Sequence, residues 1–177
     1  DKDGTTEKAI NITVQPTPYI DTNCLVLISE YVEGTGNTKA LEIFNPTAEV
    51  IDLAAGGYVV QIYANGGSTP NNTINLAGTI ASQDVYVLAH SSSVAGVLGV
   101  ADQTSANLSF NGNDAVVLRV GGTNGTVLDC IGQVGNDPGD TVGWGTGLAN
   151  TLDNTLRRMA TVKQGDTVTG DAFDPAT

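Results

Sequence analysis

The sequence predicts an all-β fold in which two sheets pack as a sandwich, and three observations lead to that prediction. Short runs of β-branched, aromatic and aliphatic residues recur along the chain, and several alternate in polarity with the two-residue period of a strand. The 177 residues include 22 glycines, and turns rich in Gly, Asn, Ser and Pro separate the runs. No long stretch shows helical periodicity, so short strands joined by tight turns are expected throughout.

The clearest element is a hairpin near the start of the sandwich. Residues 25–32 and 39–45 form two apolar runs joined by a Gly-Thr-Gly-Asn turn. Glu30 and Glu42 interrupt these runs on neighbouring strands, where basic side chains or backbone amides are expected to neutralise them. The residues with predicted structural roles are Glu30, Glu42, Lys39, Arg157, Arg158 and the only tryptophan, Trp144.

Further strands follow at short intervals. The run 114–120 is the strongest candidate for a central strand, and a glycine-rich hairpin turn connects it to the next strand. One short helix is expected at residues 94–98, with a serine of the preceding Ser-Ser-Ser run as its cap. The other predicted strands are 58–63, 73–76, 85–89, 126–131 and 155–159.

Charge narrows the range of partners. Seven basic residues against nineteen acidic ones give a net charge of −12 at pH 7. Such a surface repels nucleic-acid phosphates and anionic lipid, so no direct nucleic-acid binding is expected. No apolar run is long enough to cross a bilayer, so membrane insertion is not expected either. The balance suits an extracellular or cell-surface protein.

The sequence predicts no catalytic residue. The single histidine, His90, precedes Ser91, but neighbouring residues on a strand point to opposite faces and do not form a nucleophile–base pair. Glu30 and Glu42 form a conceivable glycosidase pair, yet sugar-cleaving sites need aromatic platforms, and aromatic residues make up 5% of the chain. We therefore expect His90 to hydrogen-bond a nearby loop.

Calcium is the one ligand that the composition favours, and no other cofactor is expected. Calcium takes about six to eight oxygen ligands, often from loops rich in Gly and Asp. No EF-hand pattern is present, and acids exposed to solvent in turns are the alternative interpretation. The candidate ligands are Asp137, Asp140, Asp166, Asp171 and Asp174.

The two cysteines, Cys24 and Cys130, leave two interpretations open. In an exported protein, a disulfide between them would close a loop of about 100 residues and stabilise the fold by roughly 4 kcal/mol. Alternatively, each is a small buried apolar residue.

Nine motifs in chain order carry a resemblance to a known family. They occupy residues 29–34, 39–45, 52–58, 84–92, 110–118, 131–139, 144–147, 153–158 and 165–175. In this order they resemble the lamin tail domain, in the bacterial form carried by large secreted nucleases and phosphatases of the endonuclease-exonuclease-phosphatase group. The resemblance implies an immunoglobulin-like β-sandwich without catalytic residues of its own, here spanning residues 19–177.

Residues 1–18 are predicted to be a separate strand and proline linker. Ile10, Ile12 and Val14 share one apolar face, and Pro16 and Pro18 form a stiff spacer. A single strand is not stable alone, so this one pairs with the sandwich, with a preceding immunoglobulin-like repeat or with a neighbouring molecule. The last arrangement is donor-strand assembly, which builds fibres.

The resulting hypothesis is a non-catalytic extracellular module that positions or anchors an attached nuclease or phosphatase. Its partners would be other domains of the same polypeptide, or proteins of the cell envelope or matrix. One alternative is a filament subunit that exchanges residues 8–14 and so forms a homo-oligomer. Another is a calcium-stabilised adhesin domain.

Overall fold

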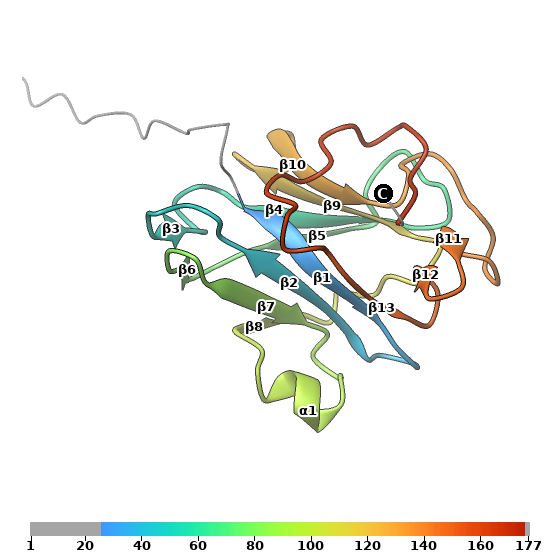
Figure 1. Ribbon diagram of the computed structural model, residues 1–177, viewed down its shortest axis with the longest axis horizontal. Coiled ribbons are helices and arrows are strands. Elements are labelled where there is room, and N and C mark those ends of the chain that lie inside the picture. The colour runs from blue at the N-terminus through green and yellow to red at the C-terminus, as the bar shows by residue number, and fades with distance from the viewer. Residues whose placement is uncertain (1–25, 176–177) are drawn as a thin grey trace, which may run out of the picture.

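Two β-sheets packed face to face form the body of the protein (Figure 1). The computed structural model describes residues 26–175, and the predicted all-β sandwich is confirmed. The predicted strand and linker at 1–18 lie outside the described residues, so they stay predictions. No helix within residues 26–175 has the length and apolar character needed to cross a membrane.

The first sheet has five strands in the order β13-β1-β2-β7-β8. Only the β7–β8 pair is parallel. The strands are β1 (Leu27–Glu33), β2 (Lys39–Phe44), β7 (Val85–Ala89), β8 (Gln103–Thr104) and β13 (Thr155–Arg157). Glu30 and Glu42 lie opposite each other in the β1–β2 register, beside a bulge between Ile28 and Glu30.

The second sheet is antiparallel and has four strands in the order β10-β9-β4-β5. They are β4 (Val59–Tyr63), β5 (Asn72–Asn75), β9 (Ala115–Val120) and β10 (Thr126–Ile131). Strand β9 lies inside the sheet, as the sequence predicts. Two small two-stranded sheets complete the fold: β3 (Ile51–Asp52) with β6 (Thr79–Ile80), and β11 (Gly145–Thr146) with β12 (Ala149–Asn150).

Strand β9 is apolar from Ala115 to Leu118 because both of its faces are buried there. Val116 and Leu118 point into the main core between the sheets, whereas Ala115 and Val117 belong to a second cluster on the outer face. We call this second cluster the outer cluster; its buried members are Tyr63, Ala115, Val117, Cys130 and Trp144. A strand buried on both faces reads as a continuous apolar run rather than an alternating one.

The short helix α1 (Ala95–Leu98) is present, but its predicted serine cap is wrong. Val94 occupies the cap position, and no side chain caps the helix. The Ser93 hydroxyl instead donates to the carbonyls of Asn37 and Lys39 and accepts from the Lys39 backbone N–H. Ser93 therefore fastens the loop to the β1–β2 hairpin rather than to the helix.

Candidate functional site

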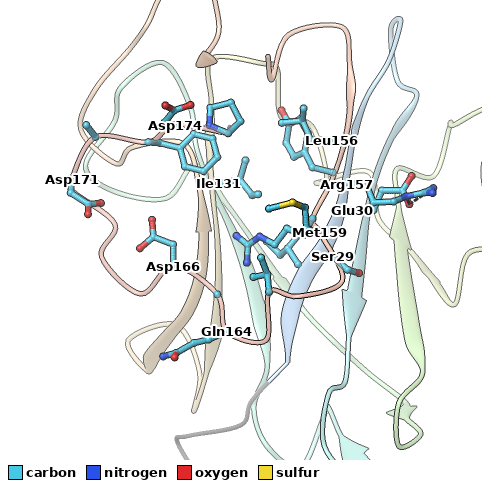
Figure 2. Close-up of a pocket in the computed structure, with 18 residues that line it drawn as sticks. Ser29, Glu30, Ile131, Leu156, Arg157, Met159, Gln164, Asp166, Asp171 and Asp174 are labelled. Atoms are coloured by element: carbon cyan, nitrogen blue, oxygen red, sulfur yellow. Dashed lines mark hydrogen bonds and ion pairs between the residues drawn. The ribbon is translucent and has the colours of Figure 1, made fainter. Parts of the chain in front are cut away.

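A groove of about 500 Å³ opens along one side of the sandwich (Figure 2). Its walls are strands β1 and β13 of the first sheet, the end of β10 in the second sheet, and the segment of residues 159–175. We call it the edge groove, because β13 and β10 are the end strands of their sheets within the described chain.

Apolar side chains form the floor of the edge groove. Ile28 and Ile131 are members of the main core, and Leu156 and Phe173 pack against that core while remaining partly accessible. Met159 also lines the groove and is 66% exposed. The groove is therefore lined by apolar side chains whose exposure increases from the buried core residues toward its opening.

Beside the groove, Asp129 and Arg158 form a buried ion pair. The Asp129 side chain has no exposed surface, and Arg158 contacts it through Nη1 at 2.8 Å and Nη2 at 2.7 Å. Asp129 also accepts from the backbone N–H groups of Ile28 at 2.7 Å and Asp166 at 2.9 Å. Burial raises the pKa of Asp129, and the Arg158 guanidinium and these N–H donors oppose that rise. One carboxylate thus joins β1, β10 and the C-terminal segment.

The neighbouring Arg157 makes a different kind of pair. Its Nη2 lies 2.9 Å from Glu30 Oε2, and its side chain is 76% exposed. Glu42 accepts a hydrogen bond from the Ser29 hydroxyl at 2.8 Å. Of the basic residues expected to neutralise the two glutamates, Arg157 therefore contacts one of them, and Arg158 binds Asp129 instead.

Lys39, the third of these basic residues, is paired with Glu33. Both side chains are almost fully buried, and Lys39 Nζ also donates to the Gly34 carbonyl at 2.9 Å. Glu33 in turn accepts from the Asp153 backbone N–H. This pair fixes the β1–β2 hairpin to the loop that precedes β13.

Sequence reasoning missed the buried carboxylates Glu33, Asp114 and Asp129. Asp129 is the one charged residue of the apolar strand β10. A charged residue inside an apolar run is also the pattern that singles out Glu30 and Glu42. This pattern could have found Asp129, but not its partner, because Arg158 is distant in the sequence.

The structure separates the five candidate calcium ligands into two groups. Asp137 and Asp140 meet at Asn113, whereas Asp166, Asp171 and Asp174 line the edge groove. Within residues 26–175, no group of three or more Asp, Glu, His or Cys side chains is placed to hold a metal ion. The calcium site stays a prediction.

Asn113 is the centre of a dense cluster of oxygen atoms. Its Nδ2 lies 3.1 Å from Asn65 Oδ1, 3.1 Å from Asp137 Oδ1 and 3.0 Å from Asp140 Oδ1, and the residue is 1% exposed. An amide nitrogen carries two hydrogens, so three acceptors exceed its donors. Burial is the main cause of the raised pKa of the adjacent Asp114, with smaller contributions from Asp137 and Asp140.

His90 makes a hydrogen bond to the loop that follows β7. His90 is buried at the end of β7, and its Nδ1 accepts from the Ser92 backbone N–H at 2.9 Å. This is the loop contact that the sequence predicts for it. Ser91 is exposed.

Cys130 and Trp144 both lie in the outer cluster. Burial raises the pKa of the Cys130 thiol to about 12, and its Sγ donates to the Gly132 carbonyl at 3.2 Å. Cys24 lies outside the described residues, so the disulfide stays a prediction. Trp144 meets Phe173 edge to face at 6.3 Å. Gly132, at φ 83°, lets the ring approach, since a Cβ there would lie 2.6 Å from it.

Together, the two sheets and their core define an immunoglobulin-like β-sandwich module. The chain belongs to the Lamin Tail Domain family, whose model matches residues 21–135. Lamin tail domains are immunoglobulin-like modules without a catalytic role of their own, which indicates a structural or binding module. Neither curated proteins nor solved structures gave a match to this chain.

Residues beyond the matched span are part of the same folded unit. The segment 136–175 supplies strand β13, Trp144 over the outer cluster and Arg158 beside the edge groove. The edge groove thus exists only where this segment and the matched residues come together.

Proposed function

We propose that this lamin tail domain is an extracellular recognition module that holds an attached nuclease or phosphatase to the cell surface or matrix. The observation that carries the proposal is the edge groove, where the partly buried Leu156 and Phe173 and the exposed Met159 lie beside an end strand. A groove of this kind suits an extended peptide segment, which pairs by its backbone and inserts alternate side chains.

The charge of the chain favours a protein partner. A net charge of −12 repels polyanions, so the module would bind protein or an attached domain rather than the nucleic acid that a linked nuclease cleaves. The two arginines at the groove do not form an anion site, because both are paired with carboxylates.

Deleting the module from the full secreted protein tests this function. We expect the enzyme to keep its kcat in solution but to appear in the medium instead of the surface fraction. A large fall in kcat would contradict the proposal, because the module would then serve catalysis. Nuclease or phosphatase turnover by residues 1–177 alone would contradict it too.

A second candidate function is the subunit of an extracellular filament in which residues 8–14 serve as the exchanged strand. It is favoured by the outer side of β13, which pairs with no other strand within residues 26–175. Sedimentation of the purified chain tests it: assembly should increase with concentration and disappear when residues 1–18 are deleted.

A third candidate is a calcium-stabilised adhesin, and the Asn113 cluster favours it. Turning the Asn113 amide by 180° would place a fourth oxygen among those of Asn65, Asp137 and Asp140. An extracellular site with Kd near ~0.1 mM would stabilise the fold by about 1–2 kcal/mol at ~2 mM calcium. Thermal melting with calcium and with chelator measures this. Asp140→Asn should abolish the shift and Asp171→Asn should leave it, whereas equal melting in both solutions would exclude the site.

A further inference from the structure

On the side of the sandwich that carries the edge groove, each sheet ends in a strand that no other described strand continues. Strand β13 ends the first sheet and pairs only with β1 among the described residues, and β10 ends the second sheet and pairs only with β9. Both end strands border the groove, with the segment 159–175 between them (Figure 2).

The backbone of β13 offers hydrogen-bonding groups to an added strand. Asn154 and Arg158 point their backbone groups toward β1: the Asn154 carbonyl accepts from Glu33, and the Arg158 N–H donates to Ser29. Because backbone groups alternate in direction along a strand, those of Thr155 and Arg157 face the opposite side. No strand among residues 26–175 pairs with them. An open strand edge is a template for pairing with another chain.

The floor of the groove matches apolar side chains spaced two residues apart. Ile28 and Ile131 lie at its base, and Leu156 and Met159 lie toward its opening. Figure 2 shows Leu156 and Met159 on one side of the groove, with Asp166, Asp171 and Asp174 on the other. An added strand would have apolar groups on one side of the groove and acidic groups on the other.

The chain contains a segment of matching chemistry outside the described residues. Ile10, Ile12 and Val14 repeat with a period of two, and Lys8 precedes them. This run is long enough to pair with the three residues of β13. Its lysine suits the acidic side of the groove.

A linker of eleven residues connects this segment to the sandwich. Residues 15–25 separate Val14 from Val26, which directly precedes β1. Pro16 and Pro18 favour extended conformations, at about 3.1 Å per residue, so the linker can span the distance to another copy.

We propose that residues 8–14 of a second copy of this chain enter the edge groove as an additional strand on β13. Ile10, Ile12 and Val14 would then contact the groove floor. This inference rests on the second candidate function and adds its acceptor site. Each copy carries one donor strand and one groove, so the contact is heterologous and extends into an open chain of subunits.

Matched variants of the full chain test both halves of the contact. Ile12→Asp puts a charge on the apolar face of the donor, and Thr13→Asp puts the same charge on its polar face. Met159→Asp puts a charge in the groove at an exposed position that the fold tolerates. In sedimentation velocity from low to high micromolar concentration, we expect wild type and Thr13→Asp to assemble, and Ile12→Asp and Met159→Asp to remain monomers.

Mixing the two monomeric variants gives the sharpest result. The Met159→Asp chain still has an intact donor, and the Ile12→Asp chain still has an intact groove, so equimolar mixing should give 1:1 dimers that grow no further. Circular dichroism of each variant confirms that it is folded. Assembly that persists in Ile12→Asp or in Met159→Asp, or a mixture of the two that gives no dimer, would overturn the groove assignment while leaving self-assembly intact. A wild type that is monomeric at every concentration would overturn the filament function as well.

Discussion

The sheet body of residues 26–135 and the segment of residues 136–175 are held in place by different means. In the body, long backbone ladders fix the strands, and the side chains alternate between the core and the opposite face. The segment has only short strands; the three-residue ladder between β13 and β1 and a few side chains, chiefly Arg158 and Trp144, join it to the body. A single side-chain contact of the irregular segment should therefore contribute as much to the free energy of unfolding as packing in the regular body does.

The largest expected effect comes from Arg158. Arg158→Met leaves Asp129 buried without its ionic partner, which typically costs about 3–5 kcal/mol. Urea unfolding of the wild type and the variant measures the difference. In an Asp129→Asn background the same substitution should cost much less, because no buried charge is left unpaired. If Arg158→Met in the otherwise wild-type protein lowers the free energy of unfolding by less than about 1 kcal/mol, the segment does not depend on this pair.

The second prediction concerns Trp144, which covers the outer cluster. Trp144→Ala uncovers Val117 and Cys130 and should lower the free energy of unfolding by about 3 kcal/mol. Leu148→Ala is the control, because Leu148 lies in the same segment but is 91% exposed. Equal stability of the two variants would mean that the outer cluster adds little to the fold.

The third prediction uses the Cys130 thiol as a pH probe of the outer cluster. The folded state holds the thiol proton up to a pKa of about 12, whereas an unfolded thiol loses it near its ordinary value. The stabilisation is complete below the unfolded pKa and is lost as pH rises toward 12, by roughly 1.5–2 kcal/mol at pH 10.

Cys130→Ala removes this dependence, so the stability difference between wild type and variant should shrink between pH 8 and pH 10. Urea unfolding at both pH values measures it, and the tyrosines titrate equally in both proteins. A difference that stays constant would mean that no free thiol titrates, as a bridge to Cys24 would produce.

The strands of the body could be predicted from the sequence because each is determined by the pattern of neighbouring residues. The apolar run at the start of β9 predicts a strand with both faces buried. Two further apolar runs joined by a turn predict the β1–β2 hairpin. The segment offers little of this kind, because residues 133–147 are rich in Gly and Asp without a period. The sequence predicts one strand in the segment, at 155–159, of which the structure forms Thr155–Arg157.

The site was harder to predict because its contacts join distant parts of the chain. The choice between Arg157 and Arg158 as a buried partner cannot be made from composition, since both follow Leu156 in the same strand pattern. Strand alternation places them on opposite faces, and only the position of β10 decides which one meets a buried carboxylate. The predicted serine cap is wrong for a similar reason, because the Ser93 hydroxyl bonds hairpin carbonyls that are distant in the sequence and Val94 occupies the cap position.

The smallest expected effect, at Arg157, completes the comparison between neighbouring arginines. Arg157→Met removes the same charge one residue before Arg158, but its side chain is 76% exposed and its partner Glu30 is accessible to water. An exposed pair of this kind contributes at most about 1 kcal/mol and is weakened further by salt. Urea unfolding at low and high salt measures it, and the difference from wild type should shrink as salt is added. A loss as large as that of Arg158→Met would show that side-chain burial does not decide the strength of these two pairs, and that β13 is held mainly from its exposed face.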